Sequence, residues 1–340
     1  MTKRRDLRWG LLTLLGIAIL VAVQATVRAQ APMAELQINA FAGASNLPIW
    51  IAQREGMFAR RGITVALSSP KGSLDQFKGL VEARYPVIVT AFDNVIAYRS
   101  GQGPAEIGAI PDLVAVMGID RGFLTLMASP GIEKVADLKG RTLAVDALST
   151  GFSFAFKDIL QKAGVNETEV SFIAVGNSDG RWRAMQEKKA DAALLTLPAD
   201  LAAADHGSKA LTTVAASFGN YLGNVVAVCQ GWATGHRTEL TAFLSGVNDA
   251  MAWLAARENK ARAIEILREQ MPALNANNLD RVYEKLLDSQ QGLIQNGTVD
   301  TQGAQTVLAL RARYASSTQG LQTLDAYRDT RYLAAESSPK

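Results

Sequence analysis

The stretch DLKGRTLAVDALSTGF, residues 137–152, decides the fold. Residues 137–141 have the composition of a turn, residues 142–146 read as a short strand, and residues 147–151 form a small polar loop. A helix is predicted to follow over residues 152–162. The free N–H groups and the positive dipole end at such a helix start attract an anion or a carbonyl oxygen. The stretch therefore predicts a strand–loop–helix unit that holds a ligand and contains no obvious catalyst.

Outward from this unit, short apolar runs alternate with helical segments. Such alternation favours an α/β protein with mostly parallel sheets. The predicted strands span residues 36–41, 63–67, 87–92, 113–119, 124–128, 142–146, 170–175, 192–196 and 225–229.

Beyond residue 235 the pattern becomes helical. Helices are predicted over residues 237–256, 260–270, 278–292 and 301–314. In the first of these, Phe243, Val247, Met251 and Leu254 recur at helical spacing and predict an apolar face. Residues 336–340 are polar and are expected to be a disordered tail.

No flexible linker interrupts the chain, so two lobes joined by strand-like crossings are expected. The crossings are predicted at residues 116–123 and 225–231, and together they form a hinge that closes on a ligand. Lobe 1 is predicted to be discontinuous, over residues 33–117 and 229–335, and lobe 2 to span residues 118–228.

The N-terminus has the pattern of a cleaved signal peptide. Basic residues precede an apolar run over residues 11–23, and Val27-Arg28-Ala29 fits the small-x-small cleavage rule. The run is short for a membrane span of about 20 residues, so an uncleaved anchor is disfavoured. Cleavage after Ala29 predicts a periplasmic protein.

The charge balance belongs mostly to that segment. The whole chain carries +3, but residues 1–29 hold five of its 35 basic residues and one of its 32 acids, so the remainder carries −1. This removes the case for nucleic acid or anionic lipid as a partner. The single cysteine, Cys229, lies in an apolar run and cannot form an internal disulfide.

Motifs that carry chemistry are absent from the sequence. It contains no C-x-x-C, H-E-x-x-H, G-x-S-x-G, P-loop or G-x-G-x-x-G pattern, and its two histidines, His206 and His236, are isolated. We therefore expect no catalytic residue, no metal and no cofactor.

The loops that follow the predicted strands supply orientation for a ligand without ionic chemistry. In open α/β sheets, ligands bind outside the carboxyl ends of the strands. Asp93 could cap a helix or contact the ligand, and Asp146 could shape a turn or contact it. Arg121, Arg181 and Arg183 could meet an anionic ligand, but a place at the surface is expected for each. The residues predicted to bind the ligand are Ala44, Ser45, Asn46, Phe92, Asp93, Asn94, Ser149, Thr150, Gly151, Phe152, Asn177, Thr196 and Pro198.

Several segments, taken in order, resemble a known family. They are LPIWIAQREGMF (47–58), AFDNVIA (91–97), VADLKGRTLAVD (135–146) and ADAALL (190–195) with Pro198. In these segments the chain resembles periplasmic substrate-binding proteins of the nitrate/sulfonate/taurine and thiamine-pyrimidine-precursor type.

The resemblance implies a type II periplasmic-binding fold with two α/β lobes, a two-crossover hinge and a helical C-terminal region. It implies a monomer that captures a small organic solute and delivers it to an ABC permease in the inner membrane. The alternative is an enzyme on the same scaffold that acts on a pyrimidine-like or small anionic substrate. The Cys-rich motif and reactive histidine of the related precursor synthases have no counterpart in this sequence, so no enzymatic activity is expected.

Overall fold

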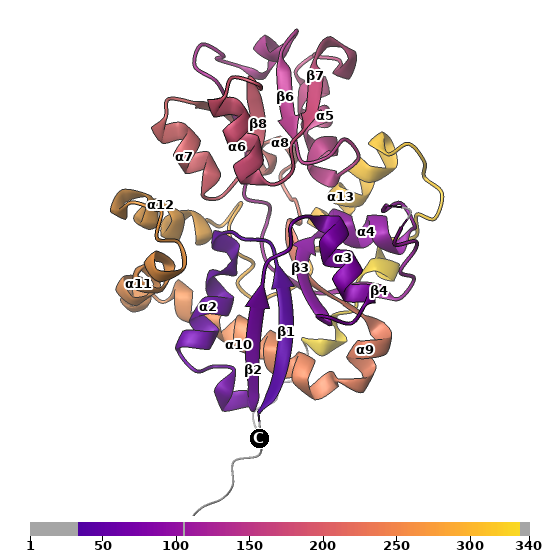
Figure 1. The fold of residues 1–340 in the computed structure, drawn as a ribbon, viewed down its shortest axis with the longest axis vertical. Helices are drawn as coiled ribbons and strands as arrows, with labels where there is room; N and C mark the ends of the chain where they lie inside the picture. Colours follow the sequence, from indigo (N-terminus) through magenta and orange to yellow (C-terminus); the bar gives the residue numbers. More distant parts are fainter. Residues whose placement is uncertain (1–32, 105, 334–340) are drawn as a thin grey trace, which may run out of the picture. The chain divides into compact units, whose positions relative to one another are not determined.

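The computed structural model describes residues 33–104 and 106–333. The predicted signal peptide (residues 1–29) and tail (residues 336–340) lie outside these residues. Among the helices of the described part, none is long and apolar enough to cross a membrane. From Ala34 onward the chain forms one compact unit, in which Figure 1 shows two sheets surrounded by helices.

The first sheet has the strand order β2-β1-β3-β10-β4. Strand β1 pairs in parallel with β2 and β3, whereas β10 runs antiparallel to its neighbours β3 and β4. Every residue of β4 is buried, as expected for an apolar strand covered on both faces. The strands are β1 (Ala34–Ala40), β2 (Ile63–Ser68), β3 (Val87–Ala91), β4 (Leu113–Gly118) and β10 (Asn224–Cys229).

The second sheet has the order β7-β6-β8-β5-β9. Strand β6 pairs in parallel with β7 and β8, whereas β5 runs antiparallel to β8 and β9. The sequence did not predict β9, because its residues KALTT contain no apolar run. The strands are β5 (Leu124–Ala128), β6 (Thr142–Val145), β7 (Ser171–Ala174), β8 (Ala192–Thr196) and β9 (Lys209–Thr213).

Helices follow most of the strands and fill the C-terminal third. The α-helices are α2 (Leu47–Arg54), α3 (Ser73–Val81), α4 (Phe92–Arg99), α5 (Gly151–Lys162), α6 (Ser178–Gln186), α7 (Ala199–Asp205), α8 (Val214–Phe218), α9 (Gln230–Gly235), α10 (Arg237–Ala255), α11 (Lys260–Gln270), α12 (Ala276–Leu286) and α13 (Thr301–Tyr314). Short 3₁₀ helices are η1 (Ala44–Asn46), η2 (Ala59–Arg61), η3 (Val135–Leu138), η4 (Glu167–Glu169), η5 (Arg257–Asn259), η6 (Leu324–Tyr327) and η7 (Thr330–Tyr332).

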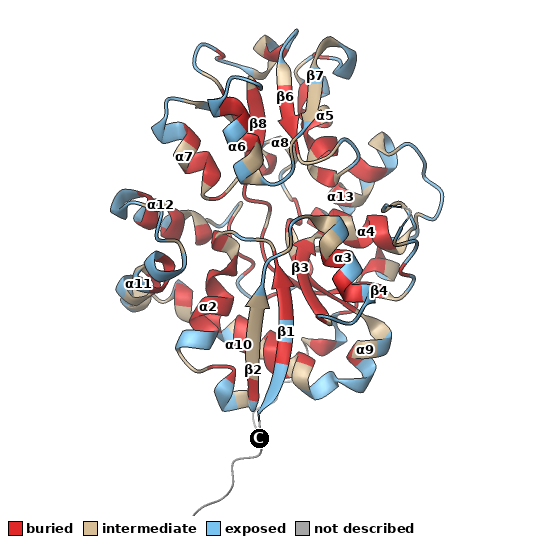
Figure 2. Ribbon diagram, viewed as in Figure 1, coloured by how far each residue is buried: buried red, intermediate tan, exposed pale blue. Residues whose placement is uncertain are grey.

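The apolar core is continuous between the two sheets. Figure 2 shows buried residues along the strands and on the helix faces turned toward them. One cluster joins Ile88 of the first sheet to Leu126 and Leu143 of the second, and to side chains of α5 and α13. The apolar face predicted for α10 is confirmed, since Phe243, Val247, Met251 and Leu254 are all buried. The sheets are therefore held together by shared burial as well as by the chain.

Two expectations about topology are corrected. The sheets are mixed and not mostly parallel, because β10 and β5 each enter a sheet against the direction of their neighbours. The second crossing lies before Asn224 and not at residues 225–231, because residues 224–229 form β10 inside the first sheet. The lobe boundaries at residues 117/118 and 228/229 stay a prediction. Because β10 pairs inside the first sheet, the structure favours an end of lobe 2 before residue 224 and not at residue 228.

The helix predicted over residues 278–292 is shorter than expected. It spans Ala276–Leu286 as α12, and the chain then turns. The Asp288 carboxylate accepts hydrogen bonds from the backbone N–H groups of Gln290 and Gln291 at 2.8 and 2.9 Å. Such local side-chain bonds compete with the helix and end it.

Candidate functional site

A cavity of about 650 Å³ lies where the loops of the two sheets face each other. Strands β1, β2 and β3 of the first sheet and β6, β7 and β8 of the second all lead into it through the segments that follow them. This is the edge at which open α/β sheets bind ligands. The loops that contain the predicted ligand-binding residues, at residues 42–46, 91–94, 148–152, 175–178 and 195–198, each contribute at least one lining residue.

Seven of the predicted residues line the cavity. They come from the first sheet and from the second, so the cavity walls belong to both. Asn94 is oriented by a hydrogen bond from its amide to the Thr90 hydroxyl at 2.9 Å. The seven are Ser45, Asn46, Asn94, Phe152, Asn177, Thr196 and Pro198.

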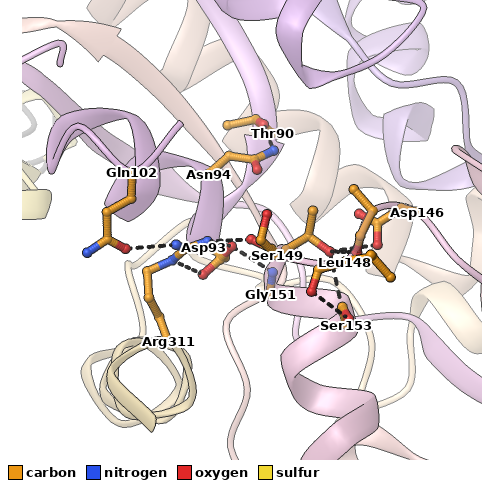
Figure 3. A network of polar contacts seen from close by, with 12 residues as sticks. Thr90, Asp93, Asn94, Gln102, Asp146, Leu148, Ser149, Gly151, Ser153 and Arg311 are labelled. Atoms are coloured by element: carbon orange, nitrogen blue, oxygen red, sulfur yellow. Dashed lines mark hydrogen bonds and ion pairs between the residues drawn. The ribbon is translucent and has the colours of Figure 1, made fainter. Parts of the chain in front are cut away.

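The other six predicted residues are not among the lining residues. Ala44 and Phe92 are fully buried in the apolar core. Asp93, Ser149 and Gly151 belong to the polar network in Figure 3. Thr150 contacts Asp146 and Ser153 through its hydroxyl group. The proposed role of these six residues as ligand contacts stays a prediction.

Asp93 is the centre of that network. Its carboxylate accepts hydrogen bonds from Nε and Nη2 of Arg311, both at 2.6 Å, and from the backbone N–H of Gly151 at 2.7 Å. Asp93 and Arg311 are each only 3 % exposed at the side chain. Arg311 also donates to the Gln102 side chain and to the Ser149 carbonyl. The network joins α4, α5 and α13, as Figure 3 shows.

The start of α5 is therefore occupied by the protein's own anion. The sequence predicts an attraction of this helix end for an oxygen ligand, and in the structure the oxygen belongs to Asp93. Position 151 must be glycine for this contact, because a Cβ atom there would overlap Asp93 and lie 2.6 Å from its Cγ.

Asp146 shapes the turn and also lines the cavity. Its carboxylate accepts a hydrogen bond from the Thr150 hydroxyl at 2.7 Å, and it is a lining residue. Burial raises the pKa of Asp146, while the nearby Arg181 charge and the Thr150 hydroxyl act in the opposite direction. The interpretation of Asp146 as a turn residue thus has a structural counterpart, and its contact with a ligand stays a prediction.

Arg181 is not at the surface, contrary to expectation. Its side chain is buried, at 3 % exposure, and it lines the cavity. Nε donates to the Leu194 carbonyl at 2.8 Å and Nη1 to the Gly176 carbonyl at 2.9 Å. Burial lowers the pKa of Arg181, and Asp146 opposes that effect. Arg181 lies three and four residues before the buried Ala184 and Met185 on the same face of α6. This helical spacing could have predicted that Arg181 is buried.

Asp120 also lines the cavity, and the sequence did not single it out. It is fully buried in the first crossing, and it accepts hydrogen bonds from Gly122 N–H and from the backbone and side chain of Asn224, at 2.9, 3.2 and 2.7 Å. Burial raises its pKa, and these donors oppose the rise. A Cβ at Gly223 would lie 2.6 Å from the Gly122 nitrogen, so the two crossings touch here.

A third missed element is the segment from the last residue of α11 to the turn before α12. Gln270, Met271, Pro272, Ala273 and Leu274 line the cavity, although they lie far along the chain from both sheets' loops. No residue type in this segment marks it as a ligand contact. Its position follows from the packing of α11 and α12, which sequence periodicity does not specify.

The cavity offers amides, hydroxyls, carboxylates, one buried guanidinium and the aromatic walls Phe41, Phe123 and Phe152. Neither cysteine nor histidine is among its lining residues within the described chain. In the same described part, no group of three His, Cys, Asp or Glu side chains is arranged to hold a metal ion. Cys229 lies elsewhere, where burial raises the pKa of its thiol to about 12.

Comparison with protein families finds one match. The model of the family described as NMT1/THI5 like matches residues 44–261, which includes the segments after β1, β3, β6 and β8. None of the curated proteins matches the chain.

Solved structures with the same architecture are numerous. A protein from Bordetella bronchiseptica RB50 is 21 % identical with a TM-score of 0.69, over 88 % of this chain and 96 % of that one. The alkanesulfonate-binding protein SsuA from Xanthomonas axonopodis pv. citri, bound to MOPS, is 16 % identical with a TM-score of 0.65, over 82 % and 91 %. The periplasmic nitrate-binding protein NrtA from Synechocystis PCC 6803 is 14 % identical with a TM-score of 0.76, over 88 % and 87 %. The predicted α/β fold of periplasmic binding proteins is confirmed.

Proposed function

Because the chain belongs to the NMT1/THI5-like family, and its fold is that of periplasmic binding proteins, we propose that it is the solute-binding component of an ABC import system. It captures a small organic solute in the cavity between its two sheets and passes it to a permease in the inner membrane. It does this as a monomer in the periplasm.

The observation that carries the proposal is the composition of the cavity. Both sheets contribute walls, so a solute completes its contacts only when the two sides face each other. A ligand with differential affinity for that arrangement shifts the population toward it. A volume of about 650 Å³ is within the usual range for small-molecule sites.

Solute binding is tested by thermal denaturation of the purified chain with a panel of small solutes. A solute present at about 100 times its dissociation constant should add about 2.7 kcal/mol to the free energy of unfolding. Calorimetry should then give one solute per chain, and the solute should be recovered unchanged. Catalytic turnover would favour the enzyme, and a panel in which no solute changes the melting temperature would contradict the proposal.

A variant that fills the cavity sharpens the test. Ser45 lines the cavity, so Ser45→Trp should abolish binding of a solute found in the panel while the melting temperature without solute changes little. Ala59→Trp is the matched control, because Ala59 is exposed in η2 and is not a lining residue. Equal affinity in the two variants would remove the cavity from the proposal.

A further inference from the structure

The charged groups that line the cavity differ in depth. Asp120 and Arg181 are buried and Asp146 is half-buried, whereas Lys71 and Asp179 are exposed. A solute that enters the cavity therefore meets Asp120, Asp146 and Arg181 where water is scarce. Charges interact more strongly in such places than at the exposed rim.

The inner cation, Arg181, already has partners within the protein. Arg181 donates to two backbone carbonyls, and the carboxylates of Asp146 and Asp179 both attract its charge. An anionic solute would have to compete with these two carboxylates for one guanidinium. The Arg181 guanidinium is therefore already engaged by groups of the protein before a solute arrives.

Asp120 adds a second carboxyl group to the same wall. Its oxygens accept three hydrogen bonds from N–H donors, and these donors oppose the rise in its pKa that burial causes. Among the residues that the structure describes, no cation forms an ion pair with it. The inner wall thus carries two carboxyl groups against one guanidinium.

At the starts of α4, α5 and α6, one N–H donor each is already bonded within the protein. The first N–H of α5 bonds to Asp93, whose charge is balanced by Arg311. The first N–H of α4, on Phe92, bonds to the Gly223 carbonyl at 2.9 Å. In α6, the Gly180 N–H bonds to the Asn177 side chain at 2.9 Å. These donors are not available to an incoming oxyanion.

We infer that the cavity selects a neutral or cationic solute that carries N–H donors and an apolar part, and that it rejects anions. The inference rests on the proposed function and specifies its solute class. The donors face the carboxylates of the inner wall, and the apolar part packs against Phe41, Phe123 and Phe152. An anion of the same shape loses its hydration and gains no net attraction.

The test is a panel of probes that share a frame and differ in charge. Thermal denaturation and calorimetry are run on the purified chain with an amidine, an amide, a carboxylate and a sulfonate on phenyl and butyl frames, next to a broad set of metabolites sorted by charge at pH 7. We expect the solutes that bind to be neutral or cationic. For any frame that binds, the amide or amidine should have a dissociation constant at least about tenfold lower than the carboxylate.

The outcomes separate this inference from the proposed function. Binding of a carboxylate or sulfonate more tightly than the amide of its own frame, or hits confined to anions, overturns the inference and leaves solute binding intact. Absence of any hit in every class overturns the proposed function and the inference with it.

A variant tests the residues named here. Asp146→Asn keeps an oxygen that can accept the hydrogen bond of the Thr150 hydroxyl, and it removes the carboxylate. The dissociation constant of a cationic solute should therefore rise by about tenfold, and the difference in affinity between this solute and the matched anion should become smaller. Asp179→Asn removes an exposed lining charge and should change affinity less. Equal effects of the two variants contradict the role of the inner wall. If Asp146→Asn does not fold, the wild-type panel alone decides.

Discussion

A single glycine determines what the start of α5 can bind. The backbone of Gly151 comes close enough to Asp93 to donate a 2.7 Å hydrogen bond, and Arg311 completes the contact from α13. The N–H donor at this helix start thus binds a carboxylate of the protein itself and is not free to bind a ligand. The attraction read from the sequence is physically correct, but the partner lies 58 residues away along the chain.

Removing Arg311 should be strongly destabilising. Arg311→Ala leaves the Asp93 carboxylate buried without its cation, and breaking a buried ion pair in this way typically costs about 3–5 kcal/mol. The free energy of unfolding measured by urea denaturation checks this. Arg84→Ala is the control, because the Arg84–Glu82 pair is about half exposed and should contribute at most about 1 kcal/mol. Equal losses in both variants would contradict the assignment.

A methyl group at position 151 should also be destabilising. Gly151→Ala places Cβ against the Asp93 side chain, and overpacking of this kind costs about 1–3 kcal/mol. Gly235→Ala is the matched control, since nothing lies within 4 Å of a Cβ at that position. The two melting temperatures should therefore move by different amounts, with that of Gly151→Ala falling.

At the scale of elements, α12 joins the two sides of the cavity. Lys285 contacts the buried Asp200 carboxylate at 2.6 Å, and Arg281 contacts Asp205 at 2.6 Å, both on α7. The segment before α12 lines the cavity, and so does the turn before α7. The pairing of α12 with α7 therefore connects two walls that belong to different parts of the chain.

Loosening this pairing should expose α12. In Lys285→Met/Arg281→Met, amide hydrogen exchange of α12 and of residues 270–274 should become faster, while exchange of α13 stays the same. Arg257→Met is the control, because Arg257 pairs with Glu284 on α12 and not with α7. Unchanged exchange in the double variant would show that apolar packing alone holds α12.

Strand and helix positions were largely predictable, and pairing was not. Runs such as residues 124–128 and 192–196 match β5 and β8, because buried strands are apolar along their length. The position of β10 between β3 and β4 depends on contacts more than 100 residues apart. Local patterns contain no record of such pairing.

The candidate site was predictable to the extent that it follows strands. Ser45, Asn94 and Thr196 line the cavity because small polar residues after a strand lie at its carboxyl end. Asp120 and the segment 270–274 lie in a crossing and between helices, where no strand marks them. Arg181 was expected at the surface because its side chain is charged. It lies, however, on the face of α6 that also buries Ala184 and Met185.

At the scale of the whole molecule, stability should fall at alkaline pH. Burial raises the pKa of Tyr314 from 10 to about 12, and its bond to the Asp158 carboxylate adds to the shift. Burial also raises the pKa of Tyr98 and Tyr221. Since the folded state favours the neutral phenol, this contribution is complete below pH 10 and is lost as the pH rises from 10 through about 12.

Urea denaturation across that range checks the prediction. The free energy of unfolding should decline above about pH 10, and the decline should be shallower in Tyr314→Phe, which has no phenol to ionise. Its stability at neutral pH should fall slightly through the lost bond to Asp158. A wild-type curve that stays flat up to about pH 11.5, or a decline that is identical in the variant, would contradict it.

The place of β10 also determines the order in which a growing chain matures. When residue 223 has been synthesised, all strands of the second sheet exist, whereas the first sheet consists of β2-β1-β3 and a separate β4. Among the strands of the described residues, β10 (224–229) is the one that pairs with both β3 and β4. The second sheet, whose strands come from the middle of the chain, can thus complete its strand pairing first. The first sheet, which contains the first strand of the chain, completes its pairing later because its contacts span the longest sequence separations.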